Sequence, residues 1–244
     1  MSSWFEVGVA GLAVWNPRQP SRPQPALLPP NERRRAPETV AIALEVAQAA
    51  CERAGRDPAQ LPTVFASTYG DQSITDYMCA TLAKAPATLS PTRFHNSVHN
   101  AAAGYWSIAT GCRQSYCALG AGPFTFAAGL FAAALQVMAD ATDVLYVAYD
   151  IESRGPLHDS LQCCGVLGLA LVLSQVGSDD ATDTRLRLSV SPEGPAQPTA
   201  VAPGNPMRVC LPLLEALEQG SAVQLSLRLG PQSWLHLATS QRSH

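Results

Sequence analysis

Residues 115–148 read SYCALGAGPFTFAAGLFAAALQVMADATDVLYVA, and this stretch decides the fold. It predicts a short strand at 115–119, a long apolar helix at 124–139 and a second apolar strand at 144–148. Strands that alternate with helices are typical of a sheet covered by helices on both faces. The stretch therefore predicts an α/β fold.

The same alternation continues on both sides of this stretch. Strands are predicted at 7–15, 63–67 and 165–174, and helices at 74–85 and 101–110. A further helix is expected to start at Pro37 and to stop at Gly55. After residue 178 the pattern predicts a strand at 185–190, a helix at 211–217 and strands at 223–229 and 233–238, with a proline-rich break at 192–206. Together these elements indicate a mostly parallel sheet.

The composition limits the possible functions. Apolar residues make up 47% of the chain, charged residues only 14%, and the net charge is −3. This balance indicates much buried surface and gives no sign of nucleic-acid binding. The N-terminus lacks a basic start followed by an apolar core, so no signal peptide is expected and the cytoplasm is the predicted compartment.

The apolar residues 118–139 and the seven cysteines have alternative interpretations. The apolar run contains Gly120, Pro123 and Gln136, which favours a buried core helix over a membrane span. An odd number of cysteines without a C-x-x-C spacing indicates reduced, mostly buried thiols. The pair Cys163 and Cys164 is interpreted as two small apolar side chains, and neither a metal nor a cofactor is expected.

Four spaced motifs carry a family resemblance: VFASTYG at 64–70, SPTRFHNSVHNAAAG at 90–104, YWSIATG at 105–111 and ATDVLYVA at 141–148. They resemble, in the same order, segments from the N-terminal half of β-ketoacyl synthases. The whole pattern is similar to the chain length factor family, in the short form associated with aryl polyene pigments of the xanthomonadin type. The resemblance implies a thiolase-like condensing-enzyme fold over a single domain, residues 1–244. Residues 1–175 resemble the complete first half, and residues 178–244 a strongly reduced second half.

The residues that perform condensation in this family are missing. Aligned between the motifs, the catalytic thiol position falls on Ala121-Gly122-Pro123, and Pro123 has no nucleophile. The histidine motifs of the second half are absent after Asp150, where the only histidines are His158 in a polar loop, His236 on the exposed face of an edge strand, and His244. The chain is therefore expected to be non-catalytic.

The resemblance also implies partners. A chain length factor pairs with an active β-ketoacyl-acyl-carrier-protein synthase, shapes its acyl tunnel and meets the carrier protein transiently. Residues 92–98 are expected to form an extended arm that contacts the partner, or else a local hydrogen-bonded loop. Phe124 and Phe126 either fill the space of an acyl chain or are ordinary core aromatics. The predicted contact residues are Thr92, Arg93, Phe94, His95, Asn96, Val98, Ser115, Tyr116, Cys117, Pro123, Phe124 and Phe126.

Two other classes of function stay open. An active acyltransferase could use Cys117, although a cysteine in this strand is expected to be buried with a raised pKa. A stand-alone acyl-binding or carrier-binding protein would need no ketosynthase. The strand 115–119 would be an open sheet edge, and such an edge favours a protein partner.

Overall fold

A computed structural model describes residues 4–15, 22–177, 184–195 and 204–241. His244 and part of the predicted proline-rich break at 192–206 lie outside these ranges. The chain forms one eight-stranded sheet in the order β3-β2-β4-β5-β1-β6-β8-β7. The strands are β1 (Phe5–Trp15), β2 (Thr63–Ala66), β3 (Tyr116–Leu119), β4 (Val144–Asp150), β5 (Leu167–Ser174), β6 (Thr184–Ser191), β7 (Gln224–Gly230) and β8 (Ser233–Gln241).

The sheet is mixed, so the prediction of a mostly parallel sheet is wrong. Among the described strands, β2 is the one that pairs in parallel with its neighbours, with β3 on one side and β4 on the other. β4 with β5, β5 with β1 and all later neighbours pair antiparallel. A parallel pair needs a connection that crosses over the sheet, and helices supply it only in the chain from β2 to β4. The positions of the predicted strands and longer helices are confirmed to within a few residues.

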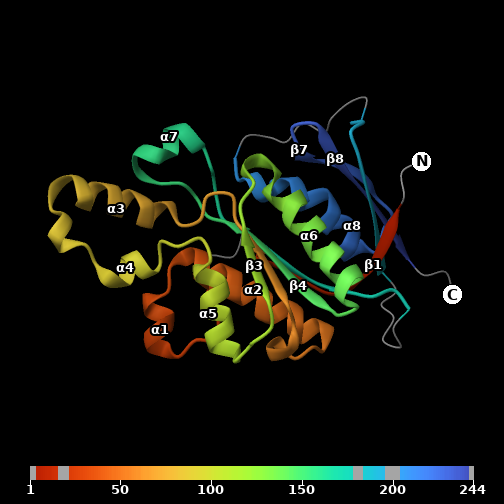
Figure 1. Cartoon of the computed structure of the whole chain (residues 1–244), viewed down its shortest axis with the longest axis horizontal. Helices are drawn as coiled ribbons and strands as arrows, with labels where there is room; N and C mark the ends of the chain where they lie inside the picture. Colours follow the sequence, from red (N-terminus) through yellow and green to blue (C-terminus); the bar gives the residue numbers. More distant parts are fainter. Residues whose placement is uncertain (1–3, 16–21, 178–183, 196–203, 242–244) are drawn as a thin grey trace.

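Helices cover both faces of the sheet (Figure 1). α2 (Glu38–Ala54) and α5 (Ala101–Thr110) pack on one face, in a core that contains Phe65, Trp106 and Leu145. α6 (Thr125–Asp140) and α8 (Leu211–Gln219) pack on the other, around Phe126 and Tyr146. Two complete thiolase halves would give two sheets. Here β6, β7 and β8 extend the first sheet beyond β1.

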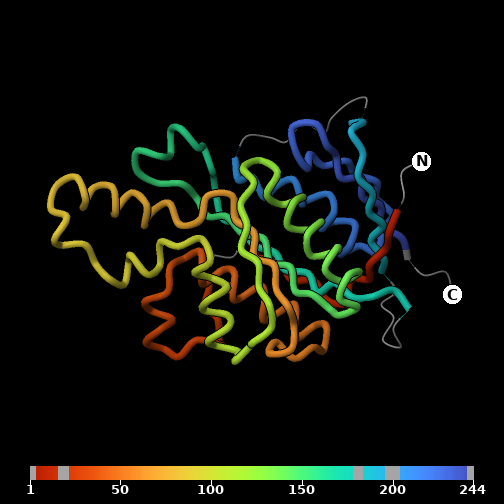
Figure 2. The backbone as a smooth tube through the Cα atoms, in the orientation of Figure 1, coloured from red at the N-terminus to blue at the C-terminus, as the bar shows by residue number. Residues whose placement is uncertain are grey.

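The remaining helices lie outside these layers. They are α1 (Pro30–Arg35), α3 (Gln72–Lys84), α4 (Pro91–His95) and α7 (His158–Leu161). α3 and α4 form a lobe that projects beyond the end of the sheet, as the backbone trace in Figure 2 shows. Of the residues in these two helices only Gln72 and Ile74 are buried, so the lobe has almost no core of its own.

The segment Gly122–Asp140, which ends with α6, is long and apolar enough to cross a membrane, but in this fold one side of it packs on the sheet. Gly129 lets α6 approach closely, because a Cβ atom there would lie 2.6 Å from Tyr146 Cε2 and 2.9 Å from Ala66 Cβ. The Tyr146 hydroxyl donates a 2.8 Å hydrogen bond to the Phe126 carbonyl and so fixes the same contact. The expectation of a core helix agrees with this packing.

We predict opposite effects for alanine at two helical glycines. Gly129→Ala forces a methyl group against Tyr146 and Ala66, and should lower the free energy of unfolding by about 1–3 kcal/mol. Gly104→Ala, the control within α5, meets nothing within 4 Å and should raise it by about 0.5–1 kcal/mol through better helix propensity. Urea denaturation of both variants measures the difference. Equal effects would contradict the close α6–sheet contact.

Candidate functional site: an open strand edge and a helix elbow

β3 lies at one end of the sheet and has no neighbour on its outer side among the described strands. The Thr63 and Ser67 amides donate to the carbonyls of Ser115 and Leu119, at 3.1 and 3.2 Å. Backbone groups alternate in direction along a strand, so the N–H and C=O groups of Tyr116 and Ala118 point away from β2. The predicted open edge is confirmed, and it offers a second strand a row of unpaired donors and acceptors.

Apolar side chains flank this edge on both faces of the sheet. Ile108 of α5 is 83% exposed, Tyr116 of β3 itself 49%, and Leu135 and Met138 of α6 are 43% and 47% exposed. Gln136 of α6 donates to the Ser115 hydroxyl at 3.1 Å, which ties the helix to the start of the edge. Large apolar residues gathered around unpaired backbone are typical of a surface that another chain covers.

Cys117 is exposed in the edge strand, so the expectation that it is buried is wrong. The reason is that β3 has a neighbour on one side only. Cys117 stands in the strand, six residues before Pro123, and not at a helix N-terminus where a thiolate would be stabilised. This position gives no support for Cys117 as a nucleophile.

The elbow between β3 and α6 contains the aligned thiol position. Pro123 is exposed there, within the single turn Gly122–Phe124 that leads into the helix. The Ala121 amide is capped by Thr125 Oγ1 at 2.9 Å, and the Thr125 hydroxyl donates to the Gly122 carbonyl at 2.7 Å. Proline has neither a nucleophilic side chain nor an N–H, so the aligned position supplies no nucleophile and no amide donor to an oxyanion.

His99 lies beside the elbow, although it was not among the predicted site residues. A Cβ on Gly120 would lie 3.4 Å from the His99 ring and 3.0 Å from the Ser67 carbonyl, and a Cβ on Gly70 would lie 3.6 Å from His99 Nδ1. The loops after β2 and β3 therefore meet around this imidazole. The repeated glycines in these loops are the sequence signal for such a close approach.

The predicted arm is not fully extended, because Thr92–His95 belong to the helical turn α4, which starts at Pro91 with Ser90 as its N-cap. The Arg93 guanidinium stacks 4.0 Å above the Tyr77 ring, and Asn96 is buried, accepting a 3.1 Å hydrogen bond from the Tyr105 hydroxyl. Phe94 is 57% exposed and Val98 47%. Local hydrogen bonds hold this segment, as expected for a local hydrogen-bonded loop. Its exposed apolar side chains are the feature expected of an arm that contacts a partner.

The two phenylalanines after the elbow differ in burial. Phe126 is buried and lies against Tyr146 with ring centroids 5.9 Å apart, as an ordinary core aromatic does. Phe124 is half-buried at the helix start. Within the described residues, no group of three or more His, Cys, Asp or Glu side chains could hold a metal ion.

The two described histidines of the second half bond to their own surroundings. His158 starts the short helix α7 rather than lying in an irregular loop, and its ring bonds to Ser153. His236 is half-buried in β8, between the Ser191 and Ser226 hydroxyls at 2.9 Å each. The edge-strand prediction for His236 is wrong, because β7 pairs outside β8 and takes the edge.

Asp150, at the end of β4, is a buried carboxyl group that the sequence analysis did not single out. Its Oδ1 accepts hydrogen bonds from the Ser67 hydroxyl at 2.8 Å and from the Thr68 amide at 2.9 Å, which fixes the loop after β2. Its Oδ2 is buried and has no hydrogen-bond partner among the described residues. Burial raises the pKa of Asp150 from the usual 3.8 to about 6, although the hydrogen bonds from the loop oppose this change.

Solved structures show the same fold. One is a ketosynthase (ApeO) in complex with its chain length factor (ApeC) from Xenorhabdus doucetiae, with a TM-score of 0.74 and 20% identity over 98% of this chain and 100% of that chain. The ishigamide ketosynthase/chain length factor gives a TM-score of 0.66 and 13% identity over 98% and 99% of the two chains. A β-ketoacyl synthase from Burkholderia phymatum STM815 gives 0.57 and 15% over 87% and 70%. Comparison with curated proteins finds no match.

The fold and the elbow at the end of β3 define a thiolase-like condensing-enzyme domain. The family model for the β-ketoacyl synthase N-terminal domain matches residues 10–235. The chain belongs to that family, as the sequence motifs predict.

We predict that Asp150→Asn changes how stability depends on pH. The pKa of this carboxyl is higher in the folded than in the unfolded state, so folding favours its protonated form. The free energy of unfolding therefore falls as the pH rises from about 4 through about 6, because the folded state must then bury a charge. The gap between 3.8 and about 6 corresponds to about 3 kcal/mol. The amide of the variant carries no charge, so relative to the unsubstituted chain the variant should gain up to that amount between pH 4 and pH 8.

Urea denaturation at both pH values measures this gain. Asp140→Asn, at an exposed carboxyl near the end of α6, is the matched control and should show no comparable change. An equal pH dependence for the two variants would contradict the assignment of a buried carboxyl with a raised pKa at Asp150.

Proposed function

We propose that this chain is a non-catalytic chain length factor that forms a heterodimer with an active β-ketoacyl-acyl-carrier-protein synthase. The observation that carries the proposal is the exposed strand β3, which offers unpaired backbone to a partner and runs into an elbow with proline at the aligned thiol position. The proposed pathway is the biosynthesis of an aryl polyene, a polyketide-like chain, in the cytoplasm. The acyl carrier protein would meet the complex only transiently.

The chemistry of the edge favours a protein partner with an equivalent open strand. Such a strand, paired antiparallel with β3, would satisfy the outward groups of Tyr116 and Ala118 and continue the sheet across the interface. Ile108, Leu135 and Met138 would be buried at the same time, on both faces of the joined sheet. The solved ketosynthase/chain length factor complexes with this fold support the choice of a ketosynthase as the partner.

The lobe of α3 and α4 supports the proposed role in chain length. Phe94 and Val98 are exposed on a segment anchored by the Arg93–Tyr77 stack and the Asn96–Tyr105 hydrogen bond. An apolar side chain held on an ordered segment is suited to close one end of the partner's acyl tunnel. The proposal therefore places Phe94 at the far wall of that tunnel, with Arg93 and the elbow beside it.

We predict that Ala118→Pro abolishes assembly with the ketosynthase. Proline removes the N–H that points away from β2, and it leaves the groups of Ser115 and Leu119 that pair with β2 in place. Ala118→Ser retains the N–H and is the matched control. Size-exclusion chromatography of co-expressed chains should give a 1:1 complex with the serine variant and separate chains with the proline variant, while thermal melting checks that both variants fold.

Acyl loading distinguishes the proposal from an active synthase. After exposure of the complex to acyl carrier protein, intact-mass analysis should show acyl mass on the partner's nucleophile. Acyl mass on a Cys117 peptide of this chain would instead support the acyltransferase alternative. A soluble monomer that binds carrier protein with no ketosynthase present would support the stand-alone alternative.

We predict that the bulk of residue 94 sets product length. Phe94→Ala should lengthen the tunnel and shift the product distribution toward longer chains, and Phe94→Trp should shorten it. Val190→Ala, at an exposed apolar residue of β6 far along the sheet, is the control and should leave the distribution unchanged. Mass spectrometry of the chains released from the complex measures the distribution. Identical distributions for all variants would overturn the tunnel-wall role.

A further inference from the structure

The connection between β4 and β5 is closed at its base by hydrogen bonds between two buried residues. The Ser153 amide donates to the Cys163 carbonyl at 2.9 Å, and the Ser153 hydroxyl accepts from the Cys163 amide at 3.1 Å. Residues 153–163 therefore form a compact loop whose ends lie together, which is the geometry of an Ω-loop. This 153–163 loop contains the single turn Gly155–Leu157 and the helix α7.

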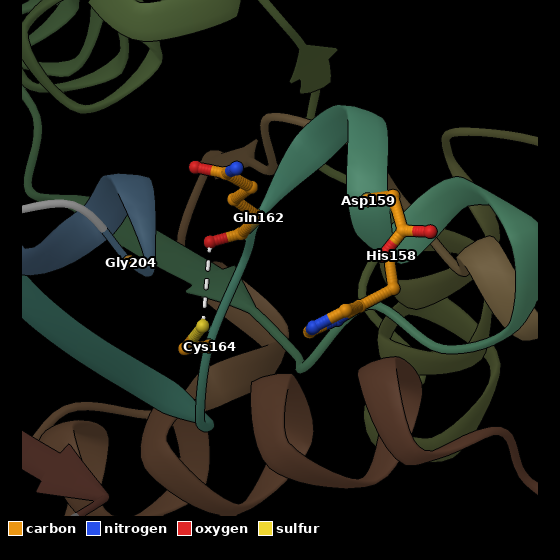
Figure 3. A pocket seen from close by; sticks show the side chains of 5 residues that line it. All are labelled: His158, Asp159, Gln162, Cys164 and Gly204. Atoms are coloured by element: carbon orange, nitrogen blue, oxygen red, sulfur yellow. Dashed lines mark hydrogen bonds between the residues drawn. The ribbon is translucent and has the colours of Figure 1, made fainter.

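The polar groups of the 153–163 loop bond mainly within it. The His158 ring nitrogen Nδ1 lies 2.9 Å from the Ser153 carbonyl. Figure 3 shows His158 on α7 and, past the end of the loop, the Cys164 thiol donating to the Gln162 carbonyl at 3.5 Å. The chain turns at Gln162, whose backbone is left-handed (φ 47°), and continues with Cys163 buried and Cys164 exposed. The interpretation of the two cysteines as one apolar pair is therefore wrong for Cys164.

The outer part of the 153–163 loop packs against α3 at Gly155. A Cβ atom on Gly155 would lie 3.2 Å from Asp76 Oδ2 and 3.3 Å from Asp76 Cγ, which is closer than non-bonded heavy atoms of this kind prefer. The Gly155 backbone is also left-handed, with φ 69°. Glycine satisfies both requirements, because it has no Cβ and adopts positive φ without strain. The absence of a side chain at residue 155 thus sets how closely the loop approaches α3.

This contact matters because the lobe of α3 and α4 has almost no core of its own. The root of the lobe is fixed by the Thr39 hydroxyl, which donates to Asp71 Oδ2 at 3.0 Å, and by the buried side chains of Gln72 and Ile74. Asp76 lies more than one helical turn beyond Asp71 along α3. The 153–163 loop therefore supports α3 beyond the part that the sheet and α2 hold.

Tyr77, the neighbour of Asp76 in the sequence, connects α3 to α4. Its hydroxyl accepts a 3.1 Å hydrogen bond from the Ser90 amide, and its ring lies 4.0 Å from the Arg93 guanidinium carbon. The Phe94 amide in turn donates to the Ser90 carbonyl at 2.9 Å. A displacement of α3 at Asp76 is therefore passed through Tyr77 to the segment that carries Phe94.

We propose that Gly155 is a positioning residue for Phe94. The close approach of the 153–163 loop to Asp76 fixes the lobe, and the lobe places Phe94 where it limits the growing chain. The proposal rests on the proposed function, in which Phe94 lies at the far wall of the partner's acyl tunnel. A side chain at residue 155 would push the loop and α3 apart and move Phe94. In this role Gly155 acts through the lobe and makes no contact with the acyl chain.

Hydrogen–deuterium exchange of the isolated full chain tests the coupling without a partner. Gly155→Ala should speed the exchange of amides in residues 90–97. Gly165→Ala is the matched control, because Gly165 has a similar left-handed backbone (φ 75°) but a Cβ there meets nothing within 4 Å. This control should leave exchange in residues 90–97 unchanged. The double variant Gly155→Ala/Asp76→Ala should restore slow exchange, because it removes the carboxylate that the new methyl group meets. Unchanged exchange in Gly155→Ala would overturn the proposal.

Mass spectrometry of the products from the ketosynthase complex tests the effect on chain length. Gly155→Ala should shift the product distribution, Gly165→Ala should not, and the double variant with Asp76→Ala should restore it. A shift with Phe94→Ala but none with Gly155→Ala would overturn the positioning role and leave the tunnel wall in place. Unshifted products from Phe94→Ala would instead overturn the tunnel wall itself. An equal shift with Gly165→Ala would assign the effect to general backbone strain and contradict the proposal. Thermal melting checks that each variant folds.

Discussion

The unpaired outer side of β3 is the constraint on which the rest of this structure depends. Within the described parts of the chain, its backbone donors and acceptors are satisfied on one side only, by β2. A buried sheet cannot leave such groups without partners, so the strand must stay in water or be covered by another chain. In the isolated chain it stays exposed, and so do Ile108, Leu135 and Met138 around it. The low charge and high apolar content of the whole chain have the same physical meaning, since they suit a subunit with a second protein against it.

The loops at the carboxyl ends of the parallel strands depend on a second feature, the buried carboxyl of Asp150. Through Ser67 and Thr68 it holds the loop after β2, which lies against Gly120 and His99. The connection after β4 leads from Asp150 to Ser153, which holds His158 and the Cys163 backbone. One sheet end therefore supports both the elbow without a nucleophile at the aligned position and the segment that carries His158 and Cys163. Loops at this end of parallel strands are where α/β proteins usually carry their ligand sites.

The sequence-based predictions of strand direction and side-chain exposure were wrong where these properties depend on which strands become neighbours. The alternation of strands and helices indicated a mostly parallel sheet, yet β5 pairs antiparallel with β4 and the later strands follow as antiparallel neighbours. The unknown strand order also explains why the exposure of Cys117 and His236 was predicted wrongly. Both lie in strands of known position, but Cys117 is exposed because β3 has one neighbour, and His236 is half-buried because β7 takes the edge. Asp150 was missed because a single aspartate after a strand gives no signal of its burial.

The sequence by itself determined the positions of the elements, the family motifs at 64–70, 90–104 and 141–148, and the absence of a thiol at the aligned elbow position. These properties are local, because periodicity, turn residues and residue identity depend only on residues that are close together in the sequence. Only the tertiary structure decided the mixed sheet, the exposure of Cys117 and Cys164, the burial of Asp150 and the orientation of His158 by Ser153. Each of these depends on contacts between residues that are distant along the chain or on the path of a loop, because burial and hydrogen bonding are fixed by which surfaces meet when the chain packs.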